Sequence, residues 1–237
     1  MNNIIENSAP INFVEETGFG LWFLDTDTWY IHVLTRAIND LQRLLEPGTT
    51  FADILDVGCG RGKSTRLLSE RFQPQSIVAL EADAALLHSV PAMTRQCNSK
   101  ITALHATATS IPIADASFDM VFCHQTFHHI ADQDCAIREF YRVLRPGGML
   151  LFAESTKRYI DSWMIRFLFR HPMEAQKTAD EYITLIRNTG FDLPAQKISL
   201  PYLWWSRGDL GIMEKLGFPP PANREETLVN AVATRPR

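Results

Sequence analysis

The chain has 237 residues, 46% hydrophobic and 21% charged, a composition that excludes disordered, collagen-like and coiled-coil proteins. Lysine and arginine number 23 and aspartate and glutamate 27, so the net charge of −4 argues against a protein that gathers nucleic acid or anionic lipid. The four cysteines show no CxxC spacing, and no lysine or arginine precedes Arg36, so we expect a cytoplasmic protein without a signal peptide. No apolar stretch approaches the roughly 20 residues of a membrane-spanning helix.

Strands and helices are predicted to alternate over most of the chain. Apolar residues at helical spacing predict a first helix over residues 28–45. Predicted strands follow at residues 51–57, 76–81, 100–106, 118–123 and 149–154, and predicted helices at 64–72, 83–90 and 132–144. A helix at 179–188 and strands at 195–200 and 227–234 complete the prediction. Alternating strands and helices indicate βαβ units and a parallel sheet buried on both faces.

A glycine-rich turn follows the first predicted strand. Asp56 is followed by glycines at positions 58, 60 and 62. Alternate glycines let the backbone turn tightly and approach a ligand at the N-terminus of the next helix. A dinucleotide-binding fingerprint would need glycine in place of Lys63, and a phosphate-binding P-loop would need glycine in place of Val57. The sequence departs from both patterns by one residue and leaves Asp-x-Gly-x-Gly-x-Gly.

Three further motifs accompany this pattern in order. They are Ile-Pro-Ile with Ser-Phe-Asp over residues 111–119, Phe-His-His-Ile at 127–130, and Arg-Val-Leu-Arg-Pro-Gly-Gly at 142–148. With them, residues 51–154 resemble the class I S-adenosylmethionine-dependent methyltransferases, specifically the small-molecule branch similar to ubiquinone and menaquinone methyltransferases. The resemblance implies a Rossmann-like α/β fold with a seven-stranded, mainly parallel sheet whose last strand is antiparallel.

The resemblance also suggests how the chain is organised. We expect a single methyltransferase domain with an N-terminal helical cap at residues 1–48, a cofactor-binding core at 49–154, and a lid, a helix and the last two strands at 155–237. Aromatic-rich segments in residues 1–48, 155–179 and 201–224 would form the lid.

The resemblance further implies where S-adenosylmethionine binds. Glu81 ends the second strand, where the family places an acidic residue on the ribose hydroxyls, and a carboxylate can accept both hydroxyl protons. The family usually has Gly-Asp-Ala at the adenine, whereas this chain has an uncharged, shorter Thr107 in place of the aspartate. The implied cofactor-binding residues are Asp56, Gly58, Cys59, Gly60, Gly62, Glu81, Ala82, Thr107, Ala108, His124 and Gln125.

Histidines crowd the loop after the fourth core strand, at the edge where open α/β sheets bind ligands. In related O-methyltransferases a histidine of this loop is the base and an acidic residue ending the fifth strand helps it; here these positions look like His128 or His129 and Glu154. A histidine that titrates near neutrality suits removal of a hydroxyl proton. Either histidine could instead pack against or cap the next helix. No third ligand supports zinc on His124 and His128, so no metal is predicted.

All five tryptophans lie outside residues 51–154, where they either attach the appendages to the core or cover the ligand edge. On the second interpretation, the substrate-contacting residues are Trp29, Tyr30, Trp163 and Trp204. A mostly apolar pocket suits a small apolar or aromatic methyl acceptor.

We expect S-adenosylmethionine-dependent methyl transfer to such a molecule, with O-methylation favoured. A cofactor-binding protein without catalysis and an enzyme that methylates a macromolecule are the alternatives. The partner expected is a small molecule, with no nucleic acid and no integral membrane segment; a homodimer is compatible with the sequence.

Overall fold

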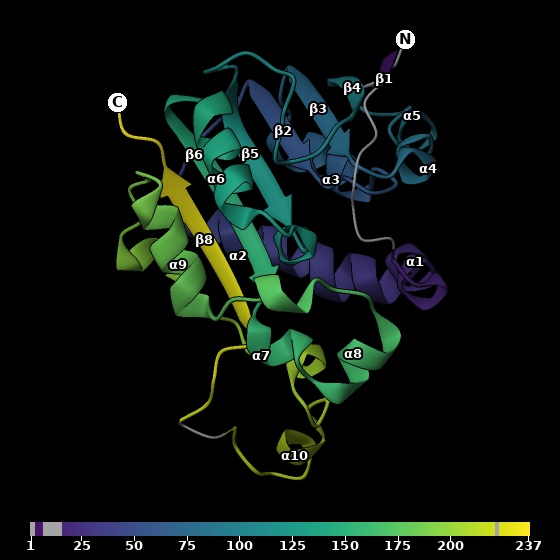
Figure 1. Ribbon diagram of the computed structural model, residues 1–237, viewed down its shortest axis with the longest axis vertical. Helices are drawn as coiled ribbons and strands as arrows, with labels where there is room; N and C mark the ends of the chain where they lie inside the picture. Colours follow the sequence, from purple (N-terminus) through teal and green to yellow (C-terminus); the bar gives the residue numbers. More distant parts are fainter. Residues whose placement is uncertain (1–2, 7–15, 221–222) are drawn as a thin grey trace.

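The computed structural model describes residues 3–6, 16–220 and 223–237. Parts of the predicted cap (1–2 and 7–15) and of the predicted lid (221–222) therefore lie outside the described residues. The centre of the fold is a sheet of order β1-β4-β3-β2-β5-β6-β8-β7 (Figure 1). Its strands are β1 (Asn3–Glu6), β2 (Asp53–Val57), β3 (Ser76–Glu81), β4 (Lys100–His105), β5 (Phe118–His124), β6 (Leu144–Ser155), β7 (Ile198–Ser199) and β8 (Leu228–Thr234).

Each of the seven predicted strands has a counterpart, although the one predicted at 195–200 is reduced to Ile198–Ser199 after a 3-10 helix at Ala195–Lys197. The prediction that the last strand is antiparallel is confirmed. Strand β8 runs antiparallel to both of its neighbours, β6 and β7, while the other pairs are parallel. Strand β1 adds an eighth, edge strand beside β4 that the sequence analysis did not predict. Its four residues include only two apolar ones, which is too short a pattern to signal a strand.

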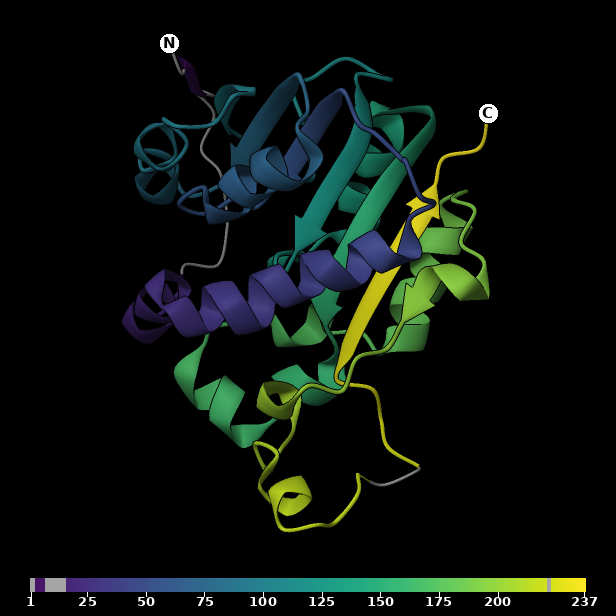
Figure 2. The same cartoon turned by 180° about the vertical axis from the view of Figure 1, so that it is seen from behind.

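Helices cover both faces of the sheet. They are α1 (Gly18–Asp25), α2 (Arg36–Leu44), α3 (Lys63–Phe72), α4 (Ala84–Leu87), α5 (Val90–Met93), α6 (Gln133–Val143), α7 (Lys157–Ile160), α8 (Trp163–Leu168), α9 (Ala179–Asn188) and α10 (Ile212–Lys215). Helices α6 and α9 lie in front of the sheet in Figure 1, and α2 crosses the opposite face in Figure 2. The structure is thus a three-layer α/β fold with a buried sheet.

Two apolar cores form because successive strand residues point to opposite faces. Leu55 and Val57 pack into the core under α6 and α9, whereas Ile54, the neighbour of Leu55, packs into the core under α2 and α3. All three side chains are buried. This two-sided burial explains why the core strands read as continuous apolar runs instead of alternating ones.

Two predicted helices differ in detail from the observed ones. The helix predicted over 28–45 begins as a π-helical segment, Trp29–Thr35, and continues as α2. The helix predicted over 83–90 is divided into α4 and α5, and Asp83 caps α4 by accepting from the amides of Ala85 and Leu86. Pro91 lies in the first turn of α5, the part of a helix that tolerates a residue without an N–H.

The edge of the sheet opposite the ligand-binding edge is held by charged side chains. Asp119 accepts from the amides of Ala52 and Asp53 through Oδ2 (2.9 and 3.0 Å) and from Arg145 through Oδ1 (2.7 Å). Arg145 also donates to Asp53 at 2.9 Å. The arginine and aspartate of two sequence motifs therefore align the starts of β2 and β5. Among the described residues, no helix is long and apolar enough to cross a membrane.

Candidate functional site

A cavity of about 560 Å³ opens at the carboxyl ends of β2, β3 and β5. Its size lies within the range of small-molecule sites. All the predicted cofactor-binding residues line it except Gly62, together with Trp29 and His129 from the predicted substrate and catalytic sets. Further lining residues that the sequence analysis did not single out are Glu16, Leu24, Asp25, Arg61, Lys63, Ser64, Asp83, Leu86, Thr109, Thr126, Ile130, Ala131 and Asp132.

The glycines after β2 serve different purposes. Gly60 has a φ of +54°, and a Cβ built there would meet no atom within 4 Å, so its backbone is bare on the cavity side. Gly58 is required by packing, because its Cβ would lie 2.2 Å from Oγ1 of Thr126. Gly62 faces Val90, because a Cβ built there would lie 3.3 Å from Cα of Val90, and Gly62 does not line the cavity.

Asp56 at the end of β2 is a buried anchor for α3. Its Oδ2 accepts from the hydroxyls of Ser64 (2.8 Å) and Thr65 (2.7 Å), both in the first turn of the helix. Burial raises the pKa of Asp56 to about 6, and the two hydroxyl donors only partly oppose this shift. The contact fixes the glycine-rich turn between strand and helix.

Glu81 at the end of β3 ties the glycine-rich turn to the next strand. Its Oε2 accepts from the amide of Gly60 (2.8 Å), and its Oε1 accepts from the amides of Ala82 (2.8 Å) and Asp83 (3.1 Å). A carboxylate has about four acceptor sites, so roughly one stays free for a ligand hydroxyl. Burial raises the pKa of Glu81, while the three amides oppose the shift.

The loop after β5 is held by the carboxylate of Glu154 on β6, which is fully buried. Oε1 accepts from the amides of Thr126 (2.8 Å) and Phe127 (2.7 Å), and Oε2 lies 2.6 Å from Nδ1 of His128. Since the carboxylate accepts from its other partners, we assign Nδ1 of His128 as the donor. The lone pair of His128 then lies on Nε2.

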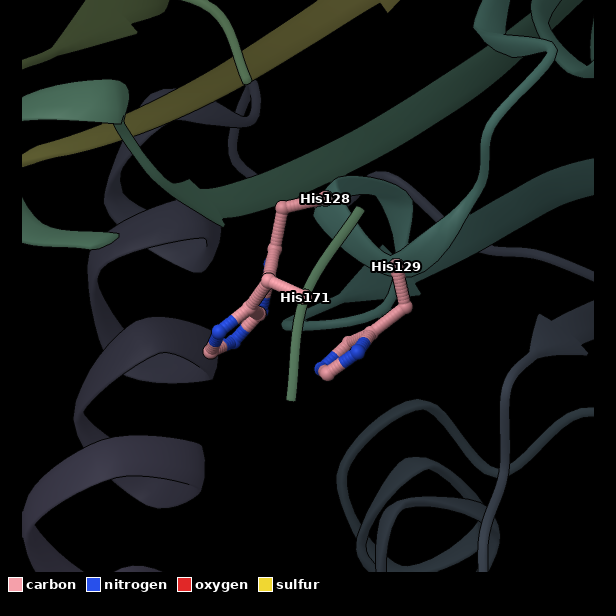
Figure 3. A group of neighbouring side chains, drawn as sticks. All are labelled: His128, His129 and His171. Atoms are coloured by element: carbon pink, nitrogen blue, oxygen red, sulfur yellow. The ribbon is translucent and has the colours of Figure 1, made fainter. Parts of the chain in front are cut away.

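The two predicted histidines occupy different environments. His129 lines the cavity, whereas His128 is buried behind it, with 4.3 Å between the two ring centroids. A third histidine, His171, approaches from the segment after α8 and stacks on His129 at 4.7 Å (Figure 3). Burial lowers the pKa of His129 well below its ordinary value and that of His171 to about 3.

His124 and Thr107 form two other parts of the wall. Burial lowers the pKa of His124 to about 4, and its ring lies edge-on to Trp29 at 5.8 Å. Its Nε2 is buried without a hydrogen-bond partner among the described residues. The hydroxyl of Thr107 lies 2.9 Å from that of Thr109, so part of its hydrogen-bonding capacity is used within its own turn.

The structure does not bring three of the predicted substrate residues to this cavity. Tyr30 packs against the core under α2 and α3. Trp163 on α8 is 81% exposed, and Trp204 borders a separate cavity of about 220 Å³ with His32. The sequence places aromatic residues on the appended segments but does not fix the direction in which each one points.

The cavity fits a nucleoside-containing cofactor. The bare backbone of Gly60 lies beside the free acceptor capacity of Glu81, and the apolar side chains of Leu80, Leu86 and Ala108 share the wall with them. An apolar wall with a few convergent polar groups is the usual form of such sites.

Comparison with known proteins agrees with this site. Residues 55–152 match the family described as Methyltransferase domain. Malonyl-acyl-carrier protein O-methyltransferase 1 of Coxiella burnetii is 28% identical over 178 residues, 73% of this chain and 60% of that protein. Trans-aconitate 2-methyltransferase of Azoarcus sp. is 33% identical over 116 residues, 49% of this chain and 44% of that protein. The chain thus spans less than two thirds of the length of these relatives.

A solved structure shows the same fold. The plantazolicin methyltransferase BamL, in complex with SAH, has a TM-score of 0.66 at 12% identity over 92% of this chain and 90% of that one. The fold is that of the class I methyltransferases, and residues 55–152 are similar to a methyltransferase domain.

Substitution of Gly60 tests the cofactor assignment. In Gly60→Ala a methyl group enters the cavity, so S-adenosylmethionine binding should weaken by at least about tenfold, or about 1.4 kcal/mol. Gly48→Ala is the matched control, because Gly48 also has a positive φ (+81°) and open space at its Cβ but lies outside the cavity. Calorimetric titration should show normal affinity in the control; equal affinities in both folded variants would refute the assignment.

Asp56 predicts a pH dependence of folding. Its pKa is about 6 in the folded protein, above the ordinary value of 3.8. The contribution of the protonated Asp56 to the free energy of unfolding is therefore full below about pH 3.8 and is lost as pH rises through 6. Asp56→Asn should therefore remove a fall in the free energy of unfolding of up to about 3 kcal/mol between about pH 4 and pH 6.

Urea unfolding of parent and variant across this pH range measures the difference. The exposed Asp134 supplies the control, since Asp134→Asn should keep the parent's fall. The same pH dependence in Asp56→Asn as in the parent would contradict the prediction.

Proposed function

We propose that the protein transfers the methyl group of S-adenosylmethionine to an oxygen atom of a small, apolar or aromatic molecule, as in the small-molecule branch of the class I methyltransferases. The observation that carries this proposal is the position of His129, which lines the cofactor cavity and packs on His128, whose ring is held by Glu154. The hydroxyl group of an acceptor bound at this part of the cavity would lie near the imidazole of His129, which would act as the base.

Orientation would supply most of the rate. S-adenosylmethionine provides an activated methyl group on a sulfonium when it is bound. Gly60 and Glu81 would hold its nucleoside part at the ends of β2 and β3, which leaves the wall near His129 for the acceptor. Fixing two reactants at attack distance contributes up to about 7–11 kcal/mol.

Several apolar side chains line the cavity. Leu24, Trp29, Phe122 and Ile130 belong to the same lining as His129. Such a wall favours a planar or aliphatic acceptor over a heavily charged one. Burial lowers the pKa of His129, which keeps a lone pair on the imidazole but makes it a weaker base than a histidine that titrates near neutrality.

Glu154 and His128 would act as positioning residues. The buried Glu154 carboxylate holds the backbone of the loop through Thr126 and Phe127 and the ring of His128 through Nδ1. His128 in turn forms the surface on which the ring of His129 rests.

A carboxylate acceptor is the second candidate. The names of the two relatives specify O-methylation of malonyl-acyl-carrier protein and methylation of trans-aconitate, both of which offer carboxylates. In this chain Arg61 and Lys63 line the cavity and could pair with such an anion. A carboxylate has no proton to lose at neutral pH and would need no histidine base.

The histidine variants distinguish the two acceptors. With a hydroxyl acceptor, His129→Ala should lower turnover by about 10²–10⁴-fold while titration with S-adenosylhomocysteine shows that cofactor binding is retained. His88→Ala, at an exposed site outside the cavity, is the control and should keep the parent's turnover.

The acceptor for this assay would come from a screen of small phenols, alcohols and carboxylic acids with methyl-labelled cofactor. Parent-level turnover in His128→Ala, His129→Ala and the double variant would remove histidine from the mechanism and favour the carboxylate. No labelled product from any compound class would contradict the proposed function.

A further inference from the structure

Three histidine side chains from two distant parts of the chain meet beside the cofactor cavity. His128 and His129 come from the loop after β5, and His171 comes from the segment after α8 (Figure 3). The ring centroids are 4.3, 4.7 and 5.1 Å apart. One nitrogen of each ring lies within 4.8 Å of those of the other two, so a modest closure would bring all three to one metal ion.

The contacts of two of these rings indicate which nitrogen is available to a ligand. With Nδ1 of His128 donating to Glu154, the lone pair of the neutral ring lies on Nε2. Nδ1 of His171 is buried without a hydrogen-bond partner among the described residues. No hydrogen bond joins one ring to another in the described part of the chain, so the cluster is not a chain of imidazoles that satisfy one another.

The contact between His128 and Glu154 is the usual support of a metal-binding histidine. Metal-ligating histidines commonly donate their second ring nitrogen to a carboxylate, which fixes the tautomer and makes the ligand more basic. The carboxylate here is fully buried and 2.6 Å from Nδ1. The cluster therefore has both ligand atoms and an orienting group.

We propose that His128, His129 and His171 form a binding site for a divalent transition-metal ion of the Zn²⁺ type. Imidazole ligands suit zinc, cobalt, nickel and copper better than magnesium or calcium. Zn–N bonds of about 2.0–2.1 Å place tetrahedral ligands roughly 3.4 Å apart, so the widest nitrogen pair would close by about 1.4 Å.

The surroundings offer an entry path and a fourth ligand. His129 lines the cofactor cavity, through which an ion can reach the cluster. Oε2 of Glu16, another cavity residue, lies 4.0 Å from Nε2 of His129. The segment that carries His171 is already tied to the loop, because Gln176 donates to the carbonyl oxygen of His128 at 2.8 Å.

An ion in this site would change the chemistry of the cavity. Each neutral imidazole has one lone pair, and a lone pair bonded to the metal cannot accept a proton. If the proposed function with its histidine base holds, the bound ion blocks methyl transfer to a hydroxyl group. The ion is then a reversible inhibitor, and it also joins the segment after α8 to the core.

Cobalt(II) titration of the full chain, observed by its visible absorption, tests the site without any turnover. We expect one ion per chain with the absorption of nitrogen-coordinated, tetrahedral Co²⁺, displaced by Zn²⁺. His171→Phe keeps a ring on His129 but removes the ligand, and it should weaken binding at least about 100-fold. His88→Asn, at an exposed histidine outside the cluster, should bind like the parent.

Two results would overturn the proposal. One is binding in the folded His171→Phe variant, or in His171→Asn if the first variant does not fold, as tight as in the parent. The other is a cobalt–thiolate charge-transfer band, which would place the ion on one of the free cysteines, Cys59, Cys97, Cys123 or Cys135.

A turnover measurement then links the site to the proposed function. Zn²⁺ should inhibit the parent reversibly with a chelator, and inhibition of His171→Phe, relative to its own metal-free rate, should need at least about 100-fold more Zn²⁺. Cobalt binding without any methyl transfer would leave the metal site standing and contradict the proposed function. Methyl transfer without cobalt binding would contradict the metal site and leave the proposed function standing.

Discussion

The buried carboxylate of Glu154 is the contact on which the ligand edge of this protein depends. It lies at the end of β6 and accepts from two amides and one imidazole of the loop after β5. Leaving buried donors unpaired costs about 1–3 kcal/mol each, so the loop has one strongly favoured position. That position decides which histidine faces the cavity and which stays behind it. The chemistry of the site therefore follows from a structural hydrogen-bond network.

A buried acidic side chain that accepts several hydrogen bonds is also found at the ends of two other strands. Asp56, the residue before the last one of β2, accepts from two hydroxyls of α3. Glu81 ends β3 and accepts from three amides, one of them from Gly60. Burial disfavours the charged form of these groups, and the converging donors offset part of that cost. Three acidic side chains thus fix the backbone at the ends of parallel strands, next to the cavity.

The sequence predicted the layers of the fold well because burial is periodic in regular elements. Strand β3 and helix α9 have the predicted bounds. Motif spacing also located the glycine-rich turn, Glu81 and the histidine loop, since all lie directly after predicted strands. His171 could not be predicted in this way. It comes from an irregular segment after α8, and only the three-dimensional path of that segment brings it to His129. The exposed position of Trp163 could not be predicted either, because aromatic composition does not specify the direction in which a side chain points.

The tautomer of His128 is the measurement that tests this account most directly. If Glu154 organises the loop, ¹⁵N NMR of the imidazole should show a protonated Nδ1 whose proton exchanges slowly. The Nδ1 proton should lose its protection in Glu154→Gln. A His128 ring protonated at Nε2 alone would contradict the account, because Glu154 would then not hold the histidine in the orientation from which the site is built.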